Sequence, residues 1–244
     1  MARYKVILAY DGTDFSGFQR QTEARTVQAE VEKALSKIGW QGSSILAAGR
    51  TDAGVHAAGQ VVAFDLDWKH ADTDLLNAIN ATLPLDIAVQ QVEQAAEDFH
   101  PRFDAKARRY RYSIFCQPQR DPLRERFAWR VWPEPELNEL QKSAKLLIGS
   151  HDFASFGRPM KEGGSTIREV FETIWQREGD RLSFEVEANA FLYHMVRRMV
   201  MVQVEVGQGF RDADLIEESL DNPQDEIQGL GPPNGLSLIQ VKYK

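Results

Sequence analysis

The sequence has little cysteine, no long apolar run and a shortage of positive charge. Its one cysteine, Cys116, has no partner for an intramolecular disulfide and excludes a zinc site built from several cysteines. This fits a reducing compartment, and we predict the cytoplasm. The first apolar run covers only residues 6–9, too short for a signal peptide. No later run reaches the ~20 residues that cross a bilayer, so we expect a globular protein without a membrane partner.

The net charge of -7 argues at first against a nucleic-acid partner, because phosphate binding depends on lysine and arginine. The distribution of charge is uneven, however. Residues 101–130 contain nine basic and three acidic side chains, a net charge of +6 that leaves -13 for the rest of the chain. This strip is compatible with RNA binding along one face. From charge alone, a solvated surface strip is the simpler interpretation.

Hydrophobic periodicity predicts the same element order in both halves, strand-helix-strand-strand-helix-strand. In the first half the expected elements cover residues 3–10, 26–38, 43–48, 60–66, 72–82 and 87–92. In the second half they cover residues 110–116, 136–148, 168–177, 182–188, 191–206 and 236–243, with an extra acidic helix at 212–220 and a loop at 156–165. This order indicates an α+β protein made of two ferredoxin-like halves.

Residues 49–60, GRTDAGVHAAGQ, are the most informative segment. They place Asp52 and Arg50 on a tight connection between two predicted strands, with glycines at both ends that permit a sharp turn and close approach of a ligand. Aspartate is also a common turn residue, and without further information a simple turn is favoured. A phosphate-binding loop is excluded because Gln60 stands where its lysine must be.

Four histidines give no indication of a metal site. We expect His56, in the same segment as Asp52, to be structural, and His100, His151 and His194 lack metal-ligand spacing.

On the predicted strand at 110–116, alternate residues point to opposite faces. Tyr110 and Tyr112 therefore share one face, and Arg109 and Arg111 share the other.

Residues 49–65, GRTDAGVHAAGQVVAFD, resemble the signature of the tRNA pseudouridine synthase A family. Six further segments match that family in the same order and extend the resemblance over nearly the whole chain: LAYDGTDFSGFQRQTEARTVQAEVEKAL, NAINATLPLDIAV, FHPRFDAKARRYRYSIF, STIREV, NAFLYHMVRRMV and GPPNGLSLIQVKY. The resemblance implies the pseudouridine synthase fold, with a central antiparallel sheet and a cleft between the halves. We place the N-terminal half, with the aspartate loop, at 1–104, and the C-terminal half, with the tyrosine strand and arginine helix, at 105–244.

The resemblance also implies the reaction. Uridine is converted to pseudouridine in the anticodon stem-loop of tRNA, at positions 38–40, without a cofactor or metal. Asp52 matches the family's catalytic carboxylate, Arg197 the arginine that pairs with it, and Tyr110 the active-site tyrosine. Asp52 has three possible roles that the sequence leaves open: attack on the ribose C1′, addition to C6 of the base, or removal of a ribose proton to give a glycal.

For RNA binding, the resemblance implies that Arg50 enters the base stack as the target uridine leaves it. Arg109 and Arg111 are expected to reach phosphates, and Tyr110 to stack on the uracil. The partners implied are tRNA and a second copy of the chain in a homodimer. The alternative is a non-catalytic RNA-binding protein or RNA chaperone on the same scaffold, which would tolerate loss of Asp52. A zinc-dependent deaminase is disfavoured because its H-x-E and P-C-x-x-C motifs are absent.

Overall fold

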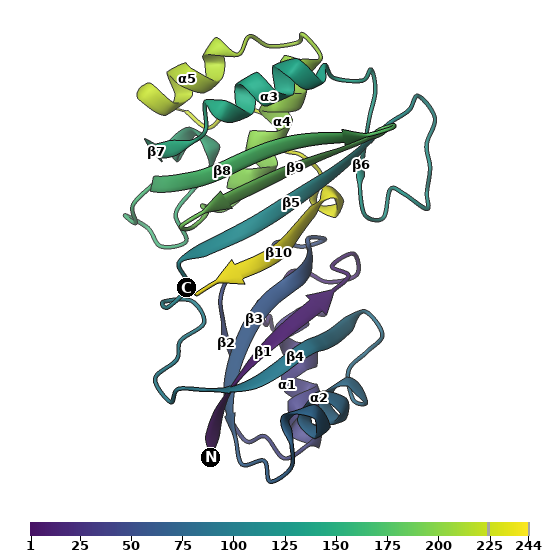
Figure 1. Cartoon of the computed structure of the whole chain (residues 1–244), viewed down its shortest axis with the longest axis vertical. Helices are drawn as coiled ribbons and strands as arrows, with labels where there is room; N and C mark the ends of the chain where they lie inside the picture. The colour runs from purple at the N-terminus through teal and green to yellow at the C-terminus, as the bar shows by residue number, and fades with distance from the viewer. Residues whose placement is uncertain (224, 244) are drawn as a thin grey trace. The chain divides into compact units, whose positions relative to one another are not determined.

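The computed structural model of the chain describes residues 1–223 and 225–243. The chain forms two compact units, one made of residues 1–106 and 237–244 and the other of residues 107–236. Both contain helices and a β-sheet, so the predicted α+β class is confirmed (Figure 1). Across the described residues, none of the helices has the length and apolar character that would let it span a membrane.

The first unit has the strand order of a ferredoxin-like fold. Its elements are β1 (Ala2–Tyr10), α1 (Val27–Lys37), β2 (Leu46–Ala47), β3 (His56–Leu66), α2 (Asp72–Asn80) and β4 (Ile87–Ala95). Strand β1 lies between β3 and β4 and is antiparallel to both, and β2 pairs antiparallel with β3. The order β4-β1-β3-β2 places each helix connection across an intervening strand, as the predicted element order requires.

Sequence patterns account for these elements. The Thr26 hydroxyl accepts a hydrogen bond from the Ala29 amide at 3.4 Å and so caps α1, and Val27, Val31 and Leu35 form its buried face. Strand β1 alternates between buried and partly exposed residues, whereas β3 is buried along most of its length. Strand β3 therefore lies at the centre of the first unit.

The last strand, β10 (Leu236–Lys242), returns to this first unit. It pairs in parallel with the start of β3, where Ser237 is opposite His56 and Leu238 is opposite Ala57. Gly59 permits the close approach, because a Cβ atom there would lie 2.4 Å from the Ile239 carbonyl oxygen. This pairing explains why residues 237–244 group with the first unit, although we expected them in a C-terminal half that starts at residue 105.

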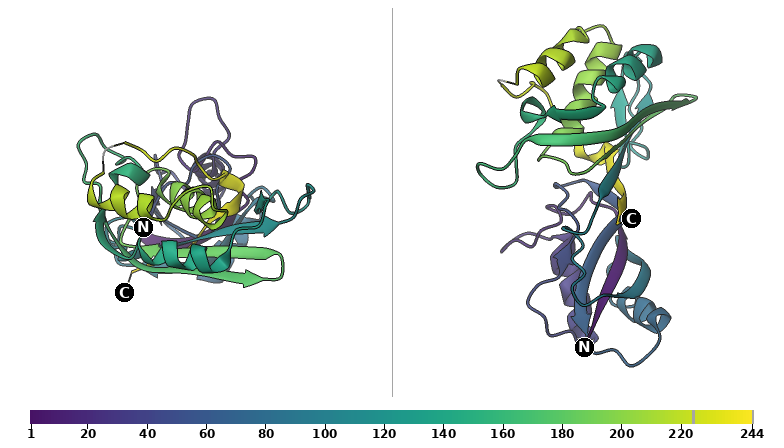
Figure 2. Two further views of the ribbon diagram at one scale, coloured as in Figure 1. Left: turned by 90° about the horizontal axis from the view of Figure 1, so that it is seen from above. Right: turned by 60° about the vertical axis from the view of Figure 1, so that its left-hand side comes forward.

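The second unit is a helix-covered antiparallel sheet. Its elements are β5 (Ala107–Cys116), β6 (Trp129–Val131), α3 (Leu137–Lys145), β7 (Gly149–Asp152), η1 (Ala154–Phe156), β8 (Ile167–Glu178), β9 (Arg181–Ala188), α4 (Met195–Gly207), α5 (Asp214–Asp221) and η2 (Pro233–Gly235). The strand order is β5-β9-β8-β7, all antiparallel, and β6 adds in parallel to β5. Figure 2 shows α3, α4 and α5 together on one face of this sheet.

Two features of the second unit differ from the sequence expectation. Strands β6 and β7 were not predicted, because three and four residues are too few to show a period. Helix α4 begins at Met195 and not at residue 191. His194 has a left-handed backbone with φ 67°, and a right-handed helix cannot continue through such a residue.

Candidate active site

The loop that carries Asp52 joins β2 to β3 in the first unit and is held by backbone hydrogen bonds. The Thr51 carbonyl accepts from the Phe18 amide at 3.0 Å, and the Gly54 amide donates to the Phe15 carbonyl at 3.3 Å. Within the loop, the Val55 amide donates to the Asp52 carbonyl at 3.2 Å. The segment 15–18, which leads into α1, therefore fixes the backbone on both sides of Asp52.

A buried hydroxyl pair adds a second anchor. The Tyr10 and Thr51 hydroxyl groups are 2.8 Å apart, and both residues are buried. Burial raises the pKa of Tyr10 to about 12, against the opposing effect of hydrogen bonds from Thr51 and Gln60. The Tyr10 phenol therefore stays neutral at physiological pH. Its hydrogen bond holds Thr51, the residue before Asp52, in place.

Two glycines allow the segments around the loop to approach one another closely. Gly17 has φ +93°, and a Cβ atom there would lie 2.9 Å from the Thr51 carbonyl oxygen. At Gly12, a Cβ atom would lie 2.0 Å from the Val55 carbonyl oxygen. His56 has a structural role here, because its Nδ1 atom accepts a hydrogen bond from the Gly12 amide at 3.0 Å.

The side chains of the loop differ in how far solvent reaches them. Thr51 is buried, Asp52 is partly buried and Arg50 is exposed. A fixed backbone with a partly accessible carboxylate and an exposed guanidinium can present both groups to a large ligand without rearranging first. This geometry is suited to holding a catalytic carboxylate in place.

In the second unit, α4 and the segment before η2 hold Arg197. Its Nε atom donates to the Gly231 carbonyl at 2.7 Å, and the Gly231 amide donates to the Arg197 carbonyl at 3.1 Å. Next to this pair, the Tyr112 hydroxyl donates to the Pro232 carbonyl at 2.6 Å. Burial strongly raises the pKa of Tyr112, and the positive charge of Arg197 only partly offsets this effect.

Tyr110 lies on the same face of β5 as Tyr112, as the strand alternation predicts. Its ring packs edge-on against Phe191, with 5.0 Å between the ring centroids, and the residue is partly exposed. Tyr110 and Arg197 thus belong to the second unit, whereas Asp52 and Arg50 belong to the first. The pairing of Arg197 with Asp52 stays a prediction.

Arg109 and Arg111 lie on the opposite face of β5 and are surrounded by carboxylates. Arg109 forms ion pairs with Glu172, with Glu185 at 3.3 Å and with Glu187 at 2.9 Å. Arg111 pairs with Glu185 at 2.6 Å. Burial by itself lowers the pKa of Arg109. The hydrogen bond to Glu187 and the charges of the three carboxylates outweigh this effect, so the pKa is raised. A phosphate at either arginine would have to compete with these glutamates.

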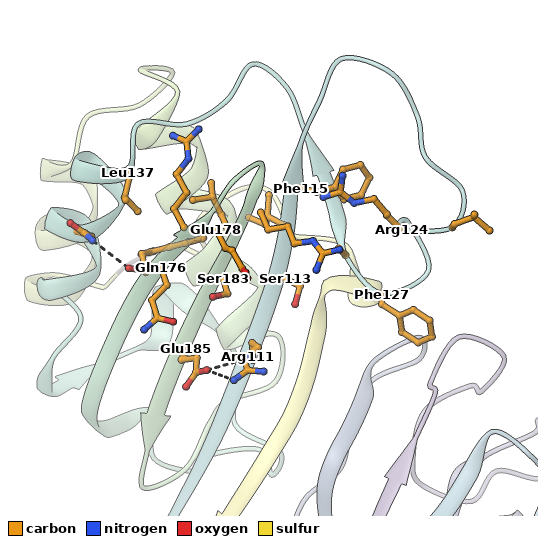
Figure 3. A pocket seen from close by; sticks show the side chains of 18 residues that line it. Arg111, Ser113, Phe115, Arg124, Phe127, Leu137, Gln176, Glu178, Ser183 and Glu185 are labelled. Atoms are coloured by element: carbon orange, nitrogen blue, oxygen red, sulfur yellow. Dashed lines mark hydrogen bonds and ion pairs between the residues drawn. The ribbon is translucent and has the colours of Figure 1, made fainter.

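A hollow of about 860 Å³ in the second unit is lined in part by residues of this face, such as Arg111 and Glu185, and also by Leu137 and Gln141 of α3. Figure 3 shows Arg111 and Glu185 joined at its edge, with Ser113, Ser183 and Gln176 beside them. Neither Tyr110 nor Arg197 lines it. This hollow is therefore separate from the residues that we predicted for catalysis. In the part of the chain that the structure describes, there is no group of three or more acidic, histidine or cysteine side chains that could hold a metal ion.

Sequence reasoning did not find several residues that hold these side chains. Tyr10 precedes Thr51 by 41 residues, and only the fold brings the two together. Gly231 was visible within the segment GPPNGLSLIQVKY, but nothing in the sequence linked it to Arg197. A Cβ atom at Gly231 would lie 2.9 Å from the Tyr112 hydroxyl oxygen, which is the physical reason for glycine there.

Comparison with known proteins defines the class to which this fold and these residues belong. A family model described as tRNA pseudouridine synthase matches residues 6–104 and 143–244. The chain is thus an isomerase that forms pseudouridine in tRNA.

The full-length relatives identify the family more closely. The chain is 37% identical to tRNA pseudouridine synthase A of Limosilactobacillus fermentum, over 100% of this chain and 96% of the relative. It is 39% identical to the protein of the same name from Exiguobacterium sp., over 100% and 99%, and 38% identical to that of Colwellia psychrerythraea, over 99% and 93%. The chain belongs to the tRNA pseudouridine synthase A family.

Proposed function

We propose that this enzyme isomerises uridines in the anticodon stem-loop of tRNA, with Asp52 as the catalytic carboxylate. The observation that carries the proposal is the Asp52 loop, in which the backbone is fixed by Phe15, Phe18 and Tyr10 while the carboxylate remains partly accessible. Catalytic groups need such a fixed backbone, because small displacements of the reacting atoms lower the rate strongly.

The reaction exchanges one glycosidic bond for another. The bond from N1 of uracil to the ribose C1′ breaks, the base turns while bound, and C5 bonds to C1′. C5 loses a proton and N1 gains one, so the mass is unchanged. An ionised Asp52 can start this sequence in any of the three ways considered above, and neither an oxidant nor a metal is needed for the balance.

Arg197 and Tyr110 have supporting roles in the proposal. The guanidinium of Arg197 would hold the Asp52 carboxylate ionised and oriented through opposite charge and directed N–H donors. Its own position is fixed by the Gly231 carbonyl. Tyr110 would stack on the uracil, which its partial exposure supports.

Arg50 would fill the space that the extruded uridine leaves in the stack. Its exposure and its position two residues before Asp52 support this role. A planar guanidinium can stack between bases and contact phosphate at the same time. We also assign phosphate contacts to Arg109 and Arg111, which requires that the RNA displace part of their glutamate shell.

We infer further that the enzyme acts in the cytoplasm, where tRNA is available, and that it works as a homodimer. Two copies of an acidic chain would offer the RNA a longer binding surface than one. Sedimentation equilibrium should give twice the mass of 27.7 kDa, and a monomer at micromolar concentration would exclude the homodimer.

The test of the catalytic assignment compares the wild type with Asp52→Asn. The pure protein is incubated with unmodified tRNA and no cofactor, and pseudouridine is mapped by carbodiimide treatment and primer extension. We expect stops in the anticodon arm with the wild type and none with Asp52→Asn, because an amide cannot act as base or nucleophile.

Binding measured in parallel separates catalysis from affinity. Asp52→Asn should bind tRNA within a few fold of the wild type, because the substitution keeps the shape of the side chain. A wild type that binds tRNA but leaves every uridine unchanged would support an RNA-binding protein instead. Equal turnover by Asp52→Asn would refute the role of this residue.

A further inference from the structure

An aromatic pair stands at the N-terminal end of α4, in the second unit. The rings of Tyr193 and His194 are stacked, with 3.7 Å between their centroids and 28° between their planes. His194 covers one face of the Tyr193 ring, yet Tyr193 is still 47% exposed. The pair thus presents an aromatic surface to solvent.

The backbone at this pair is strained. His194 is the only non-glycine residue with positive φ in the part of the chain that the structure describes. It occupies the N-cap position of α4 without a side-chain hydrogen bond to the helix, so helix capping does not explain the conformation. Strain of this kind persists where the surrounding structure imposes it, and it concentrates at functional sites.

The segment around Gly157 imposes the conformation. The Tyr193 amide donates to the Arg158 carbonyl at 2.9 Å, and a Cβ atom at Gly157 would lie 2.4 Å from the Tyr193 carbonyl oxygen. Arg198 anchors this segment in turn: its Nη1 atom donates to the Phe156 carbonyl at 2.8 Å. The backbone beneath the aromatic pair is therefore fixed from two sides.

A shared carboxylate completes the anchor. Glu226 accepts the Nη2 atom of Arg198 at 2.9 Å and the Nε atom of Arg158 at 2.6 Å. The Arg198 side chain is buried, whereas that of Arg158 is exposed. A solvent-exposed tyrosine does not need a buried ion pair to support its backbone. This anchor is suited to an aromatic ring that must be held ready for a ligand.

The position of the pair indicates which ligand it meets. Tyr193 and His194 directly precede α4, and Arg197 lies in the first turn of this helix. Exposed aromatic rings held rigidly in an RNA-modifying enzyme are typical platforms for unpaired bases. A base next to an extruded uridine is unpaired or loosened and has a free face.

We propose that Tyr193, supported by His194, stacks on a nucleobase beside the modified uridine and so helps to select the RNA. This rests on the proposed function, because it takes the anticodon stem-loop as the substrate. Stacking accepts any base but requires that a base be present, so the contact would favour flexible loops over continuous helices.

The test is a double-mutant cycle between the protein and the RNA. A synthetic anticodon stem-loop is made in versions that each lack the base of one loop nucleotide other than the target. Affinity is measured by fluorescence anisotropy for the wild type, Tyr193→Ala and Tyr193→Phe. Phe210→Ala, at an aromatic residue of the same unit that is 65% exposed, is the matched control.

We expect Tyr193→Ala to weaken binding of the intact stem-loop by about 5- to 100-fold. Tyr193→Phe and Phe210→Ala should stay within a few fold of the wild type. At one abasic position, Tyr193→Ala should cause no further loss, because the base that it contacts is already missing. Additive losses at every position, or a wild-type affinity for Tyr193→Ala, would overturn the proposal.

Wild-type turnover on the intact stem-loop separates this result from the proposed function. If the wild type forms no pseudouridine there, the substrate assignment fails, and the stacking proposal fails with it. If it turns over normally while the losses remain additive, only the stacking proposal fails. Circular dichroism melting of Tyr193→Ala checks the fold, and Tyr193→Phe keeps the ring if the alanine variant unfolds.

Discussion

The Tyr10 hydroxyl has a larger structural effect than its size suggests, because its partner is the residue before Asp52. We predict that Tyr10→Phe lowers the free energy of unfolding by about 1–3 kcal/mol, since it leaves the buried Thr51 hydroxyl without its partner. Turnover should fall as well, because the Asp52 loop loses an anchor. Urea denaturation and pseudouridine mapping measure the two effects.

Tyr4→Phe is the control on the same strand. Tyr4 is 1% exposed, and its hydroxyl accepts a long hydrogen bond of 3.5 Å from Gln94. This substitution should cost less stability and leave turnover unchanged. Equal losses from both variants would show that Tyr10 contributes to the core and not to the loop.

At the same scale, sequence and structure differ in what they reveal about the candidate site. Asp52 and Arg197 could be proposed from the sequence because each lies inside a recognisable segment. The residues that support them could not, because these contacts join distant parts of the chain: Tyr10 bonds Thr51 across 41 residues, and Arg197 bonds Gly231 across 34. Pairwise contacts at such separation leave no periodic signal in a single sequence.

At the scale of elements, Gly17 decides how closely the segment before α1 approaches the Asp52 loop. We predict that Gly17→Ala destabilises the protein by more than about 1 kcal/mol and lowers turnover. The added Cβ atom meets both an unfavourable backbone and the Thr51 carbonyl oxygen at 2.9 Å. Thermal melting and single-turnover kinetics give the two quantities.

Gly39→Ala isolates the effect of the unfavourable backbone. Gly39 has a similar φ of +95°, but no atom lies within 4 Å of a Cβ atom built there. This variant should lose stability through backbone strain alone and keep its turnover. If Gly39→Ala reduced turnover as much as Gly17→Ala, the close approach to Thr51 would not explain the effect.

Periodicity predicted the long elements well, since each of them carries a clear apolar face. Strands β1 and β9 and helices α1 and α2 agree with the predicted ranges to within a few residues. The start of α4 was missed because it depends on the backbone angle of His194, which the segment around Gly157 imposes. Strand β2 covers only Leu46–Ala47 of the predicted range 43–48, because residues 43–45 lie in the loop before it.

At the scale of the whole molecule, the excess of acidic residues limits how the enzyme can hold RNA. At least five of the nine basic side chains between residues 101 and 130 form ion pairs with carboxylates: Arg109, Arg111, Arg120, Arg124 and Arg130. The carboxylates therefore neutralise much of the positive charge that residues 101–130 carry in the sequence. Affinity for tRNA should depend on a few well-placed cations.

Salt dependence tests whether Arg111 is one of these cations. We predict that Arg111→Gln lowers the slope of log affinity against log salt concentration by about one, the amount for one lost phosphate contact. Anisotropy titrations with tRNA over a range of KCl concentrations give this slope. Arg120→Gln, at an arginine whose side chain is 76% exposed and pairs with Glu125, is the control. An unchanged slope for Arg111→Gln would leave this arginine with a structural role only.

The return of β10 to the first unit has a consequence for how the protein is made. The ribosome delivers residues 1–106 first, but the strand that pairs with the start of β3 follows only after residues 107–236. Until then Leu238, which is 1% exposed in the finished fold, is missing from its core. The domain that is synthesised first is thus the last to be finished, and a gene cut after residue 106 would encode an incomplete piece.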